Sequence, residues 1–103
     1  MKNLKIKKIN KSGLNTFVKL WNQDYLLLTS SGFRLSFQKA YTGFKNKMFD
    51  YYGLYLNNNL IGFTLIKKDN QDNFFWLKHM LIDKNYRSLG FGKYFLSWVI
   101  KKI

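Results

Sequence analysis

The sequence IDKNYRSLGFGKYFLSWVIKK, from Ile82 to Lys102, is the stretch that decides the fold of this chain. It begins where an apolar strand ends, it runs into an amphipathic helix, and it places Gly90 and Gly92 between the two. The last fifty residues contain only one other glycine. Because glycine accepts positive φ and lets a ligand approach the main chain closely, the pair predicts a loop with an unusual backbone path.

A strand, a glycine loop and a helix form a geometry that suits a phosphate group. Loop N–H groups and the first helical turn converge there, and the helix dipole favours negative charge. Arg87 and Lys93 add positive charge beside the loop. The alternative is that Gly90 only ends a turn. Two familiar phosphate loops do not fit: a dinucleotide fingerprint needs glycine in place of Phe95, and a P-loop needs Ser or Thr in place of Tyr94.

Composition restricts the class of protein. The chain has 103 residues, 19% of them aromatic, which suits one small domain with a bulky core. It has no cysteine and one histidine, which excludes disulfides, thiolate metal sites and most histidine metal sites. No segment resembles a signal peptide, and no apolar run approaches the roughly 20 residues of a membrane-spanning helix. We therefore expect a reducing, cytoplasmic setting, no metal and no membrane.

The net charge of +13 has two interpretations. It is either an electrostatic footprint for nucleic acid or a bias towards A/T-rich codons. Only two of the 18 basic residues are arginine, and the lysines are spread along the chain. That spread favours composition bias and makes nucleic acid the less favoured partner. A general attraction for phosphate-bearing ligands follows in both cases.

The hydrophobic pattern predicts a strand and two helices in the first part of the chain. LKIKKI, residues 4–9, alternates apolar and basic residues as a half-buried strand does. A first helix is indicated by apolar residues at helical spacing and by a possible N-cap. The apolar residues are Leu14, Phe17, Val18, Trp21 and Tyr25, and the possible caps are Ser12 and Asn15. A second helix follows, with apolar residues at Phe33, Phe37, Ala40, Tyr41 and Phe44.

Three strands and a helix are predicted in the rest of the chain. YYGLYL and LIGFTLI flank the triplet 57–59, NNN, which predicts a hairpin. FFWLKHMLI is apolar on both faces and predicts a central strand. The last helix begins at Gly92 and places Phe95, Trp98 or Val99, and Ile103 on one face.

The predicted order is strand, helix, helix, strand, strand, strand, helix. This is an α/β fold with a mostly antiparallel sheet. No proline, repeat or Gly/Ser linker marks a boundary, so residues 1–103 are expected to form one domain. The first strand and two helices occupy 1–47. The hairpin, the next strand and the glycine motif occupy 48–103.

MLIDKNYRSLGFGKYFL resembles the central motif of the GNAT acetyl-CoA-dependent N-acetyltransferases, and NNNLIGF resembles the hairpin before it. In that family an apolar strand and a short polar turn precede Arg/Gln-x-x-Gly-x-Gly/Ala at the start of a helix. Arg87, Gly90 and Gly92 match these three positions. The resemblance covers the whole chain in element order and is motif-specific from Trp76 to Leu96. It is nearest to the bacterial spermine/spermidine (diamine) acetyltransferases.

The resemblance implies a GNAT-like core with an acetyl-CoA site. The strand's main chain would pair with the pantetheine arm and polarise the thioester carbonyl, and the loop amides would hold the pyrophosphate. The implied cofactor-binding residues are Met80, Leu81, Ile82, Arg87, Ser88, Leu89, Gly90, Phe91, Gly92 and Lys93. The implied activity is acetyl transfer from acetyl-CoA to a small primary amine, of which a diamine or polyamine is one form.

Members of the family continue after the motif helix with a fifth strand, a helix and two more strands, whereas this sequence stops at Ile103. By this resemblance the fold lacks the usual C-terminal strands. The fourth strand is then an open edge, and a homodimer through that edge is expected. The chain is either a minimal acetyltransferase or a non-catalytic CoA-binding module. A small basic nucleic-acid-binding domain, using lysine pairs and Tyr51 and Tyr52, is a third hypothesis.

No catalytic residue is assigned. Polyamine acetyltransferases resemble one another in having acidic residues before the apolar end of the fourth strand, where this chain has Lys78 and His79. A polycation would also be repelled by the charge of +13. His79 is either a base, since an ordinary imidazole titrates near neutrality, or a residue that only flanks the sheet. The tyrosines that could act as the acid, with core packing as the alternative, are Tyr25, Tyr51, Tyr52, Tyr86 and Tyr94.

Overall fold

The structure, a computed structural model, describes residues 3–23, 34–69 and 74–102. Its elements appear in the predicted order, with two short 3-10 turns, η1 and η2, added. They are β1 (Leu4–Lys8), η1 (Lys11–Gly13), α1 (Leu14–Gln23), α3 (Phe37–Lys45), β2 (Asp50–Leu56), β3 (Asn59–Asp69), β4 (Phe74–Ile82), η2 (Lys84–Tyr86) and α4 (Phe91–Lys102). The predicted α/β fold with an antiparallel sheet is confirmed.

The four strands form one sheet in the order β1-β2-β3-β4, and every neighbouring pair is antiparallel. The predicted hairpin joins β2 to β3 and is confirmed. Its two turn residues, Asn57 and Asn58, have φ values of 51° and 67°. Asparagine tolerates this left-handed region better than most residues, which explains the polar triplet between two apolar strands.

β4 lies at the end of the strand order, so the prediction of a central strand is wrong, whereas the expected open edge is present in the described part of the chain. The end of the strand is apolar on both sides because Leu81 is buried on the α1 side and Ile82 on the α4 side, whereas Trp76 and Leu77 nearer its start are 48% and 41% exposed. A β-bulge interrupts its pairing. Leu65 pairs with His79 but Ile66 pairs with Leu77, which leaves Lys78 as an extra residue. A bulge and an exposed lysine are common protections of an edge strand.

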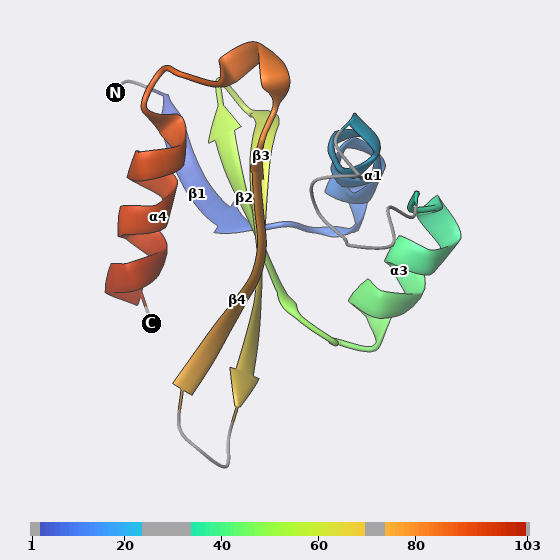
Figure 1. Cartoon of the computed structure of the whole chain (residues 1–103). Coiled ribbons are helices and arrows are strands. Elements are labelled where there is room, and N and C mark those ends of the chain that lie inside the picture. The colour runs from blue at the N-terminus through green and yellow to red at the C-terminus, as the bar shows by residue number, and fades with distance from the viewer. Residues whose placement is uncertain (1–2, 24–33, 70–73, 103) are drawn as a thin grey trace.

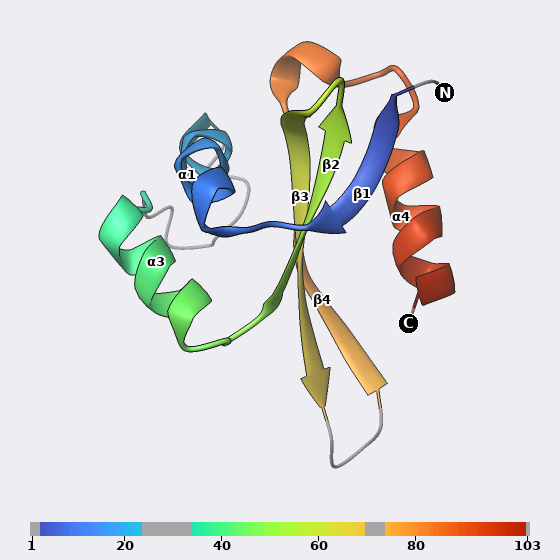
Figure 2. The same ribbon diagram turned by 180° about the vertical axis from the view of Figure 1, so that it is seen from behind.

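Helices lie on both sides of the sheet, as Figures 1 and 2 show: α1 and α3 on one face and α4 on the other. Each face has its own buried cluster. The cluster under α1 and α3 contains Ile9, Leu14, Phe17, Leu20, Trp21, Ala40, Tyr51, Tyr55, Leu60, Phe63, Leu65 and Leu81. The cluster under α4 contains Leu54, Ile61, Ile66, Ile82, Phe91, Phe95 and Val99. None of the described helices is long and apolar enough to cross a membrane.

The helix starts differ from the predictions. Asn10, rather than Ser12 or Asn15, caps the turn before α1, and its side-chain oxygen accepts from Gly13 N at 3.1 Å. The cap lies before the predicted positions because the 3-10 turn η1 precedes α1, and Asn10 caps that turn. The second helix begins at Phe37 behind the N-cap Ser36. The predicted helix residues Tyr25, Phe33 and Ile103 lie outside the described residues.

The predicted apolar faces are largely confirmed. Leu14, Phe17 and Trp21 of α1 are buried, as are Phe95 and Val99 of α4. Two differences stand out. Phe37 is 40% exposed and stacks on Tyr41 instead of entering the core, and Phe91 is buried although it was expected only as a loop residue.

Candidate functional site

The end of β4 presents main-chain groups to its open edge. Asp83 N donates to Ile61 O at 2.7 Å, so residues 61 and 83 form a hydrogen-bonded antiparallel pair. Hydrogen-bonded and non-bonded pairs alternate along such a ladder. Met80 and Ile82 therefore direct their N–H and C=O groups away from β3, whereas those of Leu81 face β3. Of the three residues predicted to meet the pantetheine arm, Met80 and Ile82 offer outward groups.

The loop after β4 folds back onto the strand end. The Asp83 carboxylate accepts from Asn85 N at 3.1 Å, and Tyr86 N donates to Asp83 O at 2.8 Å. These bonds form η2. Arg87 Nε donates to Ile82 O at 2.8 Å. Arg87 was predicted as a charge at the mouth of the loop, and this bond gives it a second task, because it ties the loop to the last residue of β4.

The glycine loop has the predicted unusual backbone. Ser88 has a φ of 66° and Gly90 a φ of 87°. A Cβ added at Gly90 would meet no other atom within 4 Å, so the space beside this residue is open. Tyr94 N donates to Gly90 O at 3.1 Å, which makes Gly90 the cap of α4. The N–H groups of the first helical turn, from Gly90 to Lys93, then have no carbonyl partner inside the helix.

Gly92 is in a different position from Gly90. It lies inside the first turn of α4, and a Cβ added there would make only an ordinary contact, 3.9 Å from Ile82 Cγ1. The packing of the chain therefore does not require glycine at this site. A ligand that lies against the first turn would require it, because a side chain would separate that ligand from the main chain.

The charge around the loop is positive. The first turn of α4 has no acidic residue, and Lys93 is exposed on it. Asp83 is the described carboxylate nearest in sequence, and it is engaged as the cap of η2. The described residues contain no group of three acidic, histidine or cysteine side chains that could hold a metal. An anion, rather than a metal ion, suits this site.

His79 lies on the α1 side of β4, one residue before the outward groups of Met80. Its ring contacts Trp21 edge-on, with ring centroids 5.0 Å apart. Burial lowers the pKa of His79 below its ordinary value of 6.5, and the charge of Lys78 lowers it further. The imidazole is therefore neutral near pH 7, which is the form that accepts a proton. The Lys78 ammonium lies 5.4 Å from the Trp76 ring centroid on the same strand.

The lowered pKa predicts how His79 affects stability with pH. Above pH 6.5 the imidazole is neutral in the folded and the unfolded protein, and its contribution is complete. As the pH falls below 6.5, the unfolded chain takes up a proton that the folded protein resists, so the free energy of unfolding decreases. His79 is the only histidine, so one ring resonance follows it by NMR. We expect the titration midpoint of His79 to lie below pH 6.5. In Lys78→Met the midpoint should rise, because the lysine charge is gone, but should stay below 6.5, because the burial remains. A wild-type midpoint above 6.5 would contradict this.

The tyrosines considered as acids or as base-stacking platforms are mostly packed. Tyr51 is 7% exposed, lies 5.6 Å from Phe17 between ring centroids, and burial raises its pKa. Tyr52 packs edge-on against Trp98 at 5.3 Å. The two tyrosines proposed for stacking on nucleic acid are therefore not both available, and Tyr51 is buried. Tyr86 tilts over Phe91, Tyr94 is 39% exposed, and Tyr25 lies outside the described residues.

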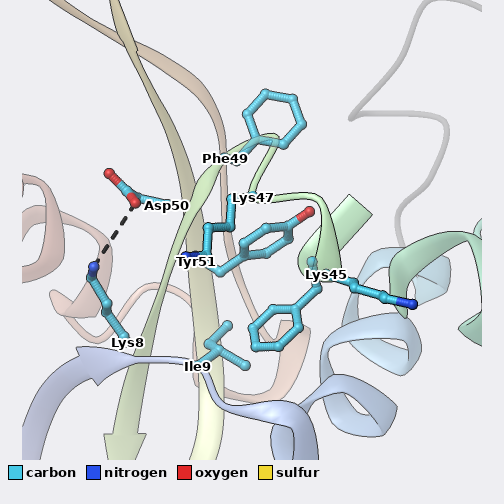
Figure 3. A pocket seen from close by; sticks show the side chains of 8 residues that line it. Lys8, Ile9, Lys45, Lys47, Phe49, Asp50 and Tyr51 are labelled. Atoms are coloured by element: carbon cyan, nitrogen blue, oxygen red, sulfur yellow. Dashed lines mark ion pairs between the residues drawn. The ribbon is translucent and has the colours of Figure 1, made fainter. Parts of the chain in front are cut away.

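The sequence did not predict the hollows that lie away from the glycine loop, near α3. One of about 390 Å³ lies where α3 ends and β2 begins. Figure 3 shows Ile9 and Tyr51 at its centre, with Lys8 directed to Asp50 and the Lys45 ammonium directed away. Lys8 Nζ lies 3.9 Å from the Asp50 carboxylate. These residues are far apart in the sequence, so no local motif could have indicated the hollow.

The sequence profile described as the acetyltransferase (GNAT) family matches residues 14–103. Comparison with curated protein sequences finds no match. Three of the solved structures that share the fold illustrate the similarity. An N-acetyltransferase from Staphylococcus aureus Mu50 has a TM-score of 0.81 and 14% identity, over 98% of this chain and 66% of that one. A ribosomal-protein-alanine N-acetyltransferase from Brucella melitensis has a TM-score of 0.80 and 13% identity, over 95% of this chain and 65% of that one.

A phosphinothricin acetyltransferase (Pat) from Sinorhizobium meliloti, in complex with AcCoA, has a TM-score of 0.79 and 13% identity, over 97% of this chain and 59% of that one. The chain thus spans 59 to 66% of the length of these three structures. Their names differ in the acceptor, and none of the three is a spermine/spermidine enzyme by name, so only the wider family is supported. Because the family profile spans nearly the whole chain, this protein belongs to the acetyltransferase (GNAT) family.

Proposed function

We propose that this chain binds acetyl-CoA where β4 meets α4 and transfers the acetyl group to a primary amine. Acetyl-CoA is the cofactor of the family to which the chain belongs. The observation that carries the proposal is the loop at Gly90: its φ of 87° and the open space beside it leave main-chain N–H groups accessible at the start of α4. The donor set is main chain, so phosphate binding does not depend on the side chains at 88 and 89, whereas Phe91 is required by its burial under α4.

The pyrophosphate of the cofactor is assigned to the loop amides from Ser88 to Lys93. Two anionic groups there would meet the positive end of α4 and the exposed charge of Lys93. Arg87 supports the loop through its bond to Ile82 O, so we assign it a positioning role as well as a charge. Gly92 lets the phosphate oxygens reach the first turn.

The pantetheine arm is assigned to the open edge of β4. The outward groups of Met80 and Ile82 have the spacing that an added strand would need. Of these groups, the Ile82 carbonyl already accepts a hydrogen bond from Arg87 Nε. Acetyl-CoA supplies its acetyl group as a reactive thioester. An outward N–H at the edge, such as that of Met80, would donate to the thioester carbonyl and so stabilise negative charge on its oxygen.

The acceptor is proposed to be a primary amine that is not a polycation. A diamine or polyamine was one form suggested by the resemblance, but Lys78 and His79 occupy the positions where acidic residues would receive such cations. We assign the base role to His79, in support of which burial favours its neutral ring and the residue adjoins the outward groups of Met80. An attacking amine must be neutral, so this proton must leave before transfer.

Thermal unfolding with and without acetyl-CoA tests cofactor binding. At a ligand concentration of a hundred times Kd we expect about 2.7 kcal/mol of added stability, which raises Tm by about 10–20 °C in a protein of this size. The shift should persist at high salt, since main-chain donors and the pantetheine arm contribute besides charge. No shift would contradict the proposed site.

Release of the CoA thiol tests acetyl transfer. The chain has no cysteine, so every thiol that appears in the reaction comes from CoA. We expect thiol release with a monoamine to exceed release with spermidine. A thermal shift without thiol release from any amine would indicate a non-catalytic CoA-binding module. Sedimentation of the same samples tests the proposed homodimer, which would use the edge of β4 and should compete with acetyl-CoA for Met80 and Ile82.

A further inference from the structure

A second cavity lies on the face of the sheet opposite α4. It has a volume of about 350 Å³ and lies between α1, α3 and the strands. Trp21 of α1, Ala40 of α3, Tyr51 of β2 and Leu65 of β3 form its walls. In Figure 1 the glycine loop before α4 and the helices around this cavity are on opposite sides of the sheet. The cavity is therefore separate from the site proposed for acetyl-CoA.

The walls of this cavity are buried and apolar. Trp21, Ala40, Tyr51 and Leu65 are each less than a tenth exposed. Ring contacts hold the aromatic walls, since Phe17 lies edge-on to both Trp21 and Tyr51, with ring centroids 6.2 and 5.6 Å apart. Protein interiors are close-packed, and an apolar hollow of this size attracts apolar molecules instead of ordered water. Pockets of this volume and lining are typical of small-molecule sites.

The mouth of the cavity is positively charged. Two lining residues are exposed, Lys39 and Met48, so the opening lies beside them. Lys39 is in the first turn of α3, where its N–H donates to the N-cap Ser36, and this turn has no acidic residue. None of the described residues that line the cavity is acidic. A helix N-terminus and an ammonium group at one opening favour a negatively charged ligand group there.

We propose that this cavity binds a small apolar monoanion, such as an aromatic carboxylate, with its ring against Trp21 and Ala40 and its carboxylate at Lys39. The apolar volume accommodates the ring, and the exposed ammonium pairs with the charge without removing it from water. The single charge at the lining matches a monoanion better than a polyphosphate. Binding at this site does not depend on acetyl transfer.

The sequence offers a direct reporter for the test. Ala40 is the only alanine, so alanine labelled with carbon-13 gives one methyl resonance, and that methyl lies in the cavity wall. The probes are phenylpropanoate, phenylpropanol and phenylpropylamine, which share one tail and differ in charge. We expect a saturable shift of the Ala40 methyl with phenylpropanoate. The alcohol should bind about 1.5- to 5-fold more weakly, as loss of one exposed charge pair implies, and the amine more weakly still.

Variants separate the charge from the cavity. Lys39→Gln should bring phenylpropanoate to the affinity of phenylpropanol, whereas Lys45→Gln, on the same helix but outside this lining, should leave the difference unchanged. Ala40→Leu fills the cavity and should abolish binding followed on the probe's own resonances, with Tm checked for folding. The proposal is overturned if no probe shifts the Ala40 methyl saturably, if the amine binds as tightly as the acid, or if both glutamine variants act alike.

Discussion

Gly90→Val is expected to abolish the stabilisation by acetyl-CoA. Gly90 has a φ of 87°, a region that a β-branched residue rarely adopts, and its missing side chain faces open space. A valine there would strain the loop by about 1–3 kcal/mol and would stand where the phosphates are proposed to lie. We expect the rise in Tm with acetyl-CoA to disappear, which corresponds to a Kd raised by more than about a hundredfold.

Two further variants separate strain from obstruction. Asparagine tolerates positive φ, so Gly90→Asn should fold almost as stably as the wild type while its side chain still occupies the open space. We expect Gly90→Asn to lose acetyl-CoA binding as well. Gly92→Ala should fold normally, because its Cβ would make only one ordinary contact, and should weaken binding less than Gly90→Val. If Gly90→Asn bound acetyl-CoA as tightly as wild type, the phosphates would lie elsewhere.

The glycine loop could be predicted from the sequence because its signal is local. Gly90 follows a strand and opens a helix within a few residues, and glycine is the residue that its φ requires. The hairpin at Asn57 and Asn58 was predictable for the same reason. The order of elements followed from the alternation of apolar and polar residues, which reports burial on one face or on two.

Features that depend on pairing between distant segments were not predictable. β4 looked central because its residues are apolar on both faces, but the side-chain pattern reports the faces of a strand and does not show whether both of its edges are paired. The bulge at Lys78 depends on how β4 aligns with β3. The bond from Arg87 to Ile82 O depends on the path of the loop, and the cavity beside Ala40 depends on four elements meeting. The spacing of apolar residues along the chain does not report how far apart such distant segments lie.

The two buried clusters differ in size, and this difference indicates which core residue should matter most for the site proposed to bind acetyl-CoA. The cluster under α4 is the smaller, and among the described helices α4 alone covers that face, directly after the loop assigned to the cofactor. Phe95 is fully buried at its centre, whereas Leu96, the next residue, is 42% exposed. Removing the Phe95 ring should therefore loosen α4 from the sheet and disturb the amides at its start.

Phe95→Ala is expected to lower the free energy of unfolding by about 3–5 kcal/mol, because a fully buried ring leaves a cavity that the structure fills only in part. In a protein of this size the loss corresponds to a fall in Tm of at least about 12 °C. Leu96→Ala is the matched control and should lose less than about 1 kcal/mol. Urea unfolding measures both losses, and acetyl-CoA should recover part of the stability of Phe95→Ala, since binding favours a docked α4. Equal losses in the two variants would mean that α4 does not pack on the sheet through Phe95.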